Sequence, residues 1–316
     1  MRTLSFLTAW LACLCAATAA DSPINISTKL ESGKLEVEYK GRKLLVYSFA
    51  TNQCKPYVQE LYTLRGENVL RDSPPDHLHH HGLMYALYVN GINFWEEKVD
   101  PGIEKHVEIP LRTAKVGADG MPTATFTEVI YWLAPTNRDA RDSYRAALLL
   151  EERKLTVRVD EKAQELALLW ESKFQVGRGA EKVKLHGPNY DGLGLRLPES
   201  FNHVAQFQNS AGTPYTGKNS QNVIPAQWTS VSGKMAGQDV MLVMFGSKAN
   251  AHAPTLFFTM LDPFAYLSAT QGVDKQPLEY GAGETFAFAY LLTVYSENKP
   301  AEFINRRYKQ WEQPGN

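Results

Sequence analysis

Residues 123–131 read Thr-Ala-Thr-Phe-Thr-Glu-Val-Ile-Tyr, and they alternate between threonines or other outward-facing types and residues suited to a core. Residues 154–159 and 35–39 repeat this alternation. A period of two residues is typical of β-strands that bury one face, because successive side chains point to opposite sides of a strand. The pattern predicts a chain that is rich in β-structure.

Further strand candidates follow along the whole chain, and turn pairs such as Asn90-Gly91 and Asp191-Gly192 separate them. These candidates are residues 43–49, 57–64, 83–89, 165–176, 227–232, 239–245, 255–260 and 285–295. More than ten strands in one chain, without a glycine-rich linker or an internal repeat, predict an all-β fold. We expect one large antiparallel β-sandwich in which two sheets pack face to face.

One helix is predicted, at the C-terminus. Pro300 and Glu302 are suited to a first helical turn, and Ile304, Tyr308 and Trp311 follow at i, i+4 and i+7. This spacing places three apolar side chains on one face. The sequence therefore predicts a short amphipathic C-terminal α-helix that docks on the sandwich.

The N-terminus has the pattern of a secretory signal. Met1-Arg2 is positive, residues 4–17 are uncharged and mostly apolar, and Ala17-Thr18-Ala19 offers small residues for cleavage. The run is shorter than the roughly 20 apolar residues of a spanning helix. We therefore predict a signal peptide over residues 1–19, a single domain over residues 20–316 and a periplasmic or secreted protein without a later transmembrane segment.

The composition and charge of the chain limit the classes of partner that it is expected to bind. Of 316 residues, 44% are hydrophobic and 21% are charged, which is typical of a folded globular protein. The formal net charge of −1 gives no global field that would favour nucleic acid, so no nucleic-acid partner is expected. Cys13 and Cys15 lie in the predicted signal, which leaves Cys54 alone in the mature chain. An internal disulfide is therefore excluded, and stability must come from the core.

The segment Ser73-Pro-Pro-Asp-His-Leu-His-His-His-Gly82 carries four of the eight histidines within five positions. If this segment is extended, His77, His79 and His81 share one face and His80 points to the other. Neighbouring imidazoles on one face would then be separated by roughly 6–7 Å at their Cα atoms. Such rings can converge on one metal ion or flank one substrate, so we predict a functional site here.

Two chemistries remain open for this segment. Imidazole is the commonest metal ligand and also titrates near neutral pH. The cofactor is therefore unknown, with a divalent or transition metal at His77 and His79 as one option. Metal-free acid–base catalysis by His77, His79 and His80 is the other, with Asp76 accepting a ring N–H.

Residues 90–97 read Asn-Gly-Ile-Asn-Phe-Trp-Glu-Glu, and the Asn-Gly turn returns the chain toward the histidines. Trp95 is a candidate sugar-binding residue, and the alternative is a core tryptophan beside solvated glutamates. From distant segments, His186 and Asp191 are candidate catalytic groups, while Arg196 and His252 are candidate substrate-binding groups. Asp191 fits a turn equally well, and Arg196 fits a buried ion pair equally well.

Several motifs together resemble a family of exported bacterial proteins labelled methane oxygenase PmoA. They are Lys55-Pro-Tyr57, the histidine segment with Gly82, residues 89–95, Asp191-Gly-Leu-Gly-Leu-Arg196 and Gln227-Trp-Thr229. The resemblance spans nearly the whole mature chain. It implies a β-sandwich like that of galactose mutarotases and sandwich-type polysaccharide enzymes, with a carbohydrate or another small molecule as substrate.

Three functions therefore compete. The first is an exported carbohydrate-active enzyme of the epimerase, lyase or hydrolase type that uses the histidine cluster. The second is a copper- or iron-dependent oxygenase in which His-x-His and a third ligand hold the metal, as the family label suggests. The third is a glycan-binding protein without catalysis, in which Trp95 and Trp228 carry the contacts.

Overall fold

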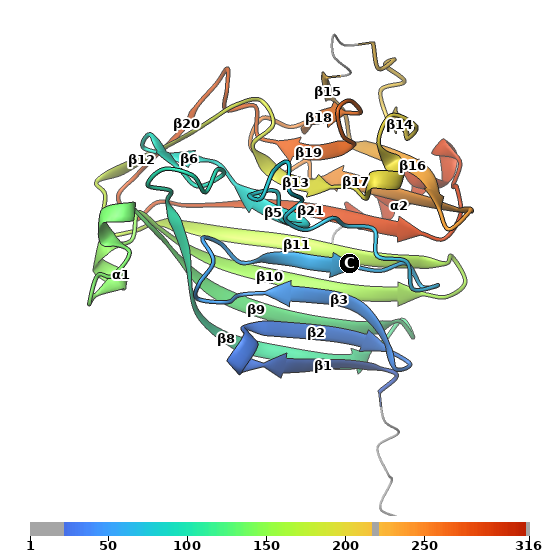
Figure 1. Ribbon diagram of the computed structural model, residues 1–316, viewed down its shortest axis with the longest axis horizontal. Helices are drawn as coiled ribbons and strands as arrows, with labels where there is room; N and C mark the ends of the chain where they lie inside the picture. Colours follow the sequence, from blue (N-terminus) through green and yellow to red (C-terminus); the bar gives the residue numbers. More distant parts are fainter. Residues whose placement is uncertain (1–21, 217–220, 314–316) are drawn as a thin grey trace, which may run out of the picture.

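The structure is a computed structural model that describes residues 22–216 and 221–313. Three antiparallel sheets make up most of it, and the two large ones pack face to face (Figure 1). This confirms the predicted all-β sandwich. The predicted signal peptide, residues 1–19, lies outside the described residues, and so do Cys13 and Cys15.

The first large sheet has nine strands and carries the strands nearest the histidine segment. Its order is β1 (Ile24–Lys29), β2 (Lys34–Tyr39), β3 (Arg42–Ser48), β4 (Tyr57–Leu61), β5 (Leu83–Ala86), β13 (Gly192–Arg196), β19 (Tyr266–Thr270), β18 (Leu256–Met260) and β15 (Asn222–Pro225). Strands from both halves of the chain meet at the centre, where β13 pairs with β5 and β19.

The second large sheet has eight strands. Its order is β14 (Gln206–Asn209), β16 (Trp228–Met235), β17 (Gln238–Gly246), β21 (Thr285–Tyr295), β11 (Glu165–Val176), β10 (Leu149–Asp160), β9 (Pro122–Leu133) and β8 (Ile103–Val116). A third sheet contains β20 (Leu278–Gly281), β12 (Lys182–His186), β6 (Tyr88–Val89) and β7 (Ile92–Asn93). The short α1 (Ser143–Ala146) follows β9.

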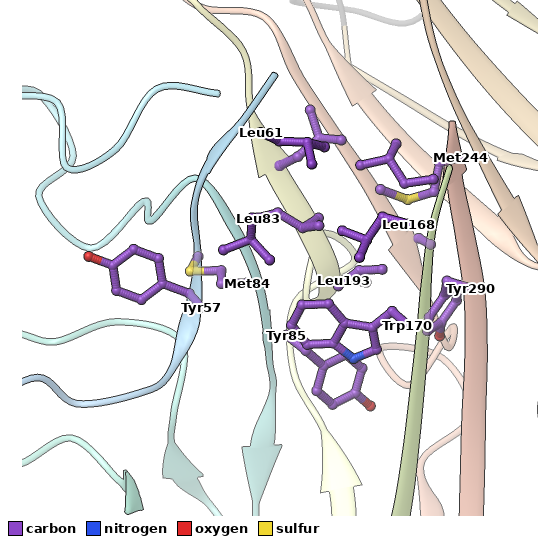
Figure 2. Packing of buried hydrophobic residues seen from close by; sticks show 14 of the residues in the cluster. Tyr57, Leu61, Leu83, Met84, Tyr85, Leu168, Trp170, Leu193, Met244 and Tyr290 are labelled. Atoms are coloured by element: carbon purple, nitrogen blue, oxygen red, sulfur yellow. The ribbon is translucent and has the colours of Figure 1, made fainter. Parts of the chain in front are cut away.

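Alternation along the strands builds the core between the two large sheets. Leu83, Tyr85 and Leu193 of the nine-stranded sheet meet Trp170 and Met244 of the other sheet (Figure 2). All five side chains are buried, and each buried aliphatic or aromatic side chain contributes about 1.5–3 kcal/mol. This interior stabilises the sandwich, and Cys54, the cysteine within the described residues, is a free thiol.

The C-terminal helix α2 (Ala301–Trp311) confirms the sequence prediction. Ile304 and Tyr308 are buried against Trp228, Phe245 and other residues on the outer face of the eight-stranded sheet. No helix within residues 22–216 and 221–313 is long and apolar enough to cross a membrane.

A charged network is buried inside the sandwich around Arg153, and we call it the Arg153 network. The Arg153 side chain donates from Nε and Nη2 to Glu151, from Nη2 to Glu104 at 3.0 Å, and from Nη1 to the carbonyl of Pro56 at 2.8 Å. Arg153, Glu104 and Glu151 are fully buried. Every nitrogen of this guanidinium therefore has a partner.

Candidate functional site

The histidine segment is a loop of successive turns between β4 and β5, so the expectation of an extended segment is wrong. The backbone N–H of His77 donates to the carbonyl of Pro74, and that of His80 donates to the carbonyl of His77, both at 2.9 Å. Pro74 and Pro75 favour this outcome because proline cannot donate to a ladder and restricts the residue before it. Side chains three positions apart then lie on one side, which replaces the alternation of a strand.

Three of the four rings gather as a result. His77 stacks on His80 with ring centroids 4.5 Å apart, and His79 meets the edge of His80 at 4.6 Å. His81, which was expected on the face of His77 and His79, turns away. Its Nδ1 lies 3.1 Å from Asp72, its Nε2 lies 3.0 Å from Glu97, and its ring stacks on Tyr57.

Arg196 of β13 ties this loop to the nine-stranded sheet. Its Nη2 donates to Asp76 at 2.8 Å, and Asp76 also lies 3.1 Å from Nδ1 of His77. Burial raises the pKa of Asp76, but the hydrogen bonds from Arg196 and His77 outweigh it and hold that pKa at about 2. Asp76 is therefore ionised at neutral pH, and it orients the His77 ring through Nδ1.

The residues around Arg196 explain how a pocket can form over this sheet. In Gly-Leu-Gly-Leu-Arg, Leu193 and Leu195 are buried in the core, so Gly194 and Arg196 share the opposite face. A Cβ on Gly194 would clash with the hydroxyl of Tyr266 and would lie 2.9 Å from the Trp95 ring. The missing side chain lets both aromatic residues lie directly on β13.

These parts enclose a cavity of about 290 Å³, which we call the histidine pocket. Outward-facing residues of β18 and β19 line it, together with the histidine loop and the segment after β7. The lining residues are His77, His79, His80, Trp95, Glu96, Lys98, Tyr190, Gln221, Phe258, Met260, Pro263, Phe264 and Tyr266. Asn93 fixes the wall at Trp95, because its side-chain oxygen accepts from the backbone N–H groups of Trp95 and Glu96.

Burial keeps the His79 and His80 side chains of the pocket uncharged at neutral pH. Burial lowers the pKa of His79 to about 4, against the attraction of Glu96. Burial lowers the pKa of His80 to about 2, and the neighbouring His79 and His77 rings add to the effect. A neutral imidazole offers one donor and one acceptor, which is the pairing that a sugar hydroxyl can satisfy.

Several buried polar atoms beside the pocket have no partner in the described part of the chain. They are both carboxyl oxygens of Asp191, the hydroxyl of Tyr266 and Nε of Arg196. Burial, with repulsion from Glu96, raises the pKa of Asp191 well above its usual range. Buried polar groups are nearly always hydrogen-bonded, so these atoms are exceptions among the described residues.

Comparison with known proteins gives a family. A family model described as a family of unknown function, DUF6807, matches residues 34–309. The chain belongs to this family. The resemblance to the family labelled methane oxygenase PmoA stays a prediction, because the matching description does not carry that label. No curated protein matches the chain in sequence.

Solved structures similar to this DUF6807 chain include carbohydrate enzymes. The GH36 α-galactosidase AgaB from Geobacillus stearothermophilus has 12% sequence identity and a TM-score of 0.48, and the match covers 87% of this chain and 41% of that one. The galactose mutarotase related enzyme from Lactobacillus acidophilus has 10% identity and a TM-score of 0.44, with coverage of 87% and 99%. The DUF6807 chain thus spans about two fifths of the length of the galactosidase that it matches.

The structure brings most of the predicted site residues of this DUF6807 chain together. His77, His79, His80 and Trp95 line the pocket. Asp76 and Arg196 support the histidine loop, and Asp191 follows the lining residue Tyr190. Trp95 is also almost fully buried, so it combines the two alternatives raised by the sequence.

Three predicted residues lie elsewhere. Trp228 is buried beneath α2, where its indole N–H donates to Asn305. His252 lies after β17, and its Nδ1 is 2.7 Å from the carbonyl of Gln271. His186 belongs to the third sheet, where its Nε2 accepts from the backbone N–H of Gly91. None of the three lines the histidine pocket.

The predicted metal site at His77 and His79 stays a prediction. No group of three or more histidine, cysteine, aspartate or glutamate side chains in residues 22–216 and 221–313 is arranged to hold a metal. The Arg196 guanidinium lies 3.5 Å from Nδ1 of His80. A fixed positive charge at that distance opposes a second cation.

The sequence reasoning did not single out the aromatic floor of the pocket. Tyr266, Phe264 and Phe258 come from β18, β19 and the connection between them, and Tyr190 precedes Asp191. These residues have no motif, and their role depends on which sheet face they occupy. The pair Gly192 and Gly194 was the available signal, because glycines two apart in a strand indicate a close approach on one face.

Proposed function

We propose that this chain is an exported carbohydrate-active enzyme that binds a sugar ring in the histidine pocket and transfers a proton at a ring carbon or oxygen. The reaction type is that of an epimerase or a lyase. Export rests on the predicted signal peptide of residues 1–19.

One observation carries the proposal. The polar side chains of His77, His79 and Glu96 line a cavity whose floor is aromatic. A sugar ring matches both the aromatic floor and the polar groups. Its C–H faces pack on aromatic rings, and its hydroxyls both donate and accept hydrogen bonds. An apolar ligand would leave the polar atoms unpaired, which is costly in a buried site.

Acid–base roles follow from the hydrogen bonds. When His77 is neutral and donates from Nδ1 to Asp76, its Nε2 is left as a proton acceptor. We assign His77 as the general base, with Asp76 as its orienting partner. His79 is held neutral by burial and supplies a hydrogen bond to the substrate. Glu96, on the segment after β7, lines the same cavity and is the second group that can exchange a proton.

The positions and partners of the carboxyl groups favour a proton-transfer reaction over glycoside hydrolysis. Most glycosidases need two carboxyl groups that flank the scissile bond. Asp76 is engaged by Arg196 and His77, and the carboxyl group of Asp191 is not among the groups that line the cavity. Among the described lining residues, Glu96 is the one that carries a carboxylate. The pocket therefore combines one carboxylate with imidazoles in place of a pair of carboxyl groups.

The test uses mature protein, residues 20–316, with a panel of aldoses and uronic-acid oligosaccharides in D₂O. Proton NMR follows anomer interconversion, loss of ring C–H signal to deuterium and the appearance of unsaturated products. The variants His77→Gln and His79→Gln are compared with His203→Ala, an exposed histidine that pairs with Asp262. We expect His77→Gln to slow turnover by about 10²-fold or more, because general-base catalysis contributes that much.

Two outcomes would overturn the proposal. Wild-type protein that binds oligosaccharide in calorimetry without converting it is a glycan-binding protein. Turnover that is unchanged in both His77→Gln and His79→Gln places the chemistry outside the histidine pocket. Circular dichroism of each variant shows that a loss of activity is not a loss of fold.

A further inference from the structure

His81 belongs to the histidine loop and reaches across to the segment after β7, although it is not itself one of the described lining residues of the histidine pocket. The loop carries His77 and His79 on one wall of the pocket, and the segment after β7 carries Glu96 on another. The His81 side chain is only 8% exposed, and each of its ring nitrogens lies against a carboxylate. A single buried side chain therefore connects two walls.

On the Nδ1 side, His81 closes the histidine loop at its base. Nδ1 lies 3.1 Å from Oδ1 of Asp72, the residue before the loop, and 3.0 Å from the hydroxyl of Ser73. The backbone repeats this closure, because the N–H of Ser73 donates to the carbonyl of His80 at 3.0 Å. The residues between them, including His77, are therefore held between two ends that are fixed to each other.

On the Nε2 side, His81 anchors the opposite wall. Oε1 of Glu97 lies 3.0 Å from Nε2 of His81 and accepts from Nζ of Lys55 at 2.6 Å. The fully buried Lys55 also donates to the carbonyl of Trp95 at 3.1 Å. Glu96 lies between Trp95 and Glu97 in the chain, so both of its neighbours are anchored.

Asp72, His81, Glu97 and Lys55 form a charge-balanced set, which we call the His81 bridge. A ring that faces a carboxylate at each nitrogen donates to both only as an imidazolium, so two cations meet two carboxylates. Burial raises the pKa of Glu97, but the hydrogen bonds from His81 and Lys55 outweigh it and hold that pKa at about 2. Charge-assisted hydrogen bonds are roughly twice as strong as neutral ones, so the bridge fixes its members in place.

The aromatic floor of the pocket is built from other elements. Phe258 and Tyr266 belong to β18 and β19 of the nine-stranded sheet, which pair with each other. The His81 bridge instead fixes the walls that carry His77 and Glu96. Loss of the bridge should therefore disturb the relation between the two proton-transferring groups more than the surface on which a sugar ring stacks.

We propose that His81 is a positioning residue, which holds the general base His77 on one wall and Glu96 on the other in a fixed relation. Its two hydrogen bonds do this together, one by closing the histidine loop and the other by anchoring Glu97. The catalytic part of this role rests on the proposed function, whereas the coupling of the two walls does not. No covalent step occurs at His81.

The first test is hydrogen–deuterium exchange of the mature protein, read by mass spectrometry of peptides that cover residues 72–82 and 93–98. The variant is His81→Phe, which keeps a ring to stack on Tyr57 but removes both hydrogen bonds. We expect amides of both segments to exchange at least about fivefold faster than in wild type, because exchange reports local opening. This readout needs no substrate.

His106→Phe is the matched control. His106 is also partly buried, with Nδ1 2.6 Å from the buried carboxylate of Glu128 and its ring 4.6 Å from that of Phe49. It does not line the histidine pocket or belong to the His81 bridge. The same substitution there should leave exchange in residues 72–82 and 93–98 as it is in wild type.

The second test is the kinetics of the two variants on the sugar that the wild-type protein converts. We expect His81→Phe to lower kcat by about tenfold or more, because misplacement of reacting groups by about 1 Å is costly. KM should stay within about threefold of wild type, since the aromatic floor is retained. Loss of folded protein alone would lower kcat equally in His106→Phe at equal stability, so circular dichroism fixes the folded fraction of each variant.

Glu97→Gln is a milder variant that still folds if His81→Phe does not. The amide oxygen can accept from Lys55, but the charge that attracts His81 is gone. Exchange should rise in residues 93–98 more than in residues 72–82, because the contact between His81 and Asp72 remains.

Three results would overturn the inference. They are wild-type exchange in either segment of His81→Phe, faster exchange of both segments in His106→Phe, and equal loss of kcat per folded molecule in the two variants. A wild-type protein that converts no sugar refutes the proposed function instead, and the exchange measurements then still decide whether His81 couples the two walls.

Discussion

The Arg153 network and the histidine pocket both remove charged or titratable groups from water, yet they differ in how those groups are paired. Each nitrogen of the Arg153 guanidinium donates to a protein acceptor. In Arg196, by contrast, Nη2 donates to Asp76, while Nε has no partner among residues 22–216 and 221–313. Both arginines are almost fully buried.

This difference distinguishes stability from binding. A satisfied buried network specifies how the two large sheets pack, and removal of one member leaves charges uncompensated. An incompletely paired group keeps hydrogen-bonding capacity for a ligand. Within the part of the chain that the structure describes, the carboxyl oxygens of Asp191 and the hydroxyl of Tyr266 belong to the second kind.

The largest expected effect comes from breaking the satisfied network. Arg153→Met should lower the free energy of unfolding by about 3–5 kcal/mol, because it leaves Glu151 without its buried counter-ion. Urea denaturation measures the change. Arg158→Met is the matched control, since Arg158 is partly exposed where it pairs with Asp119, and it should cost less than about 1 kcal/mol. Equal costs for the two variants would contradict a structural role for the network.

Filling the space over β13 should have the next largest effect. Gly194→Ala places a methyl group against the Tyr266 hydroxyl and the Trp95 ring, and overpacking of this kind costs about 1–3 kcal/mol. Sugar binding should weaken as well, because both aromatic residues line the pocket. Thermal unfolding and calorimetry test these points. Gly281→Ala, which meets no atom closer than 3.6 Å, should change neither quantity.

The variant Asp191→Asn tests an incompletely paired group through the pH dependence of the free energy of unfolding. Because the pKa of Asp191 is raised in the folded state, the folded protein retains a proton that the unfolded chain loses above about pH 4. Wild-type stability should therefore fall as the pH rises from about 4 toward the raised value, by about 1.4 kcal/mol for each pKa unit. Asn cannot ionise, so the variant should lose this part of the slope.

Urea denaturation at pH 4 and pH 8 gives the two points that matter for Asp191→Asn. The exposed Asp139 provides the control substitution, Asp139→Asn, which should leave the slope as it is in wild type. An Asp191→Asn variant that kept the full wild-type slope would show that Asp191 is ionised and paired in the folded protein.

The smallest effect is expected where both charges face water. Lys234 of β16 lies opposite Asp239 of β17, with Nζ 2.7 Å from Oδ1 and both side chains well exposed. Lys234→Ala should change the free energy of unfolding by about 0.5 kcal/mol or less. A loss comparable to that of Arg153→Met would mean that burial does not separate the two classes of charged group.

The sequence predicted the long central strands and the C-terminal helix. Residues 165–176 and 285–295 form β11 and β21 with the expected bounds, although buried and more exposed residues alternate over only part of each strand. β8 was missed because it is an edge strand in which Pro110 lies beside a shift of register, so its faces do not alternate cleanly. β19 was missed because it is buried on both faces and short.

The candidate site was predictable where residue types are concentrated. The density of histidines in residues 77–81 drew attention to the loop, but the alternation of a strand placed His81 on the wrong side. Trp228 shows the other limit. A tryptophan in a strand covered on both sides gives no sign of which face it occupies, and here it packs under α2. The roles of the gathered residues remain predictions.

The walls of the histidine pocket come from segments that are far apart in sequence, since His77 and His79 lie in the first third of the chain and Phe264 and Tyr266 in the last fifth. Contacts between such distant segments close large loops and form slowly, whereas hairpins such as β9–β10 and β10–β11 close locally. During refolding, sheet signal should therefore recover before ligand affinity does. Any fragment that ends before β18 would lack the pocket, however well its hairpins formed.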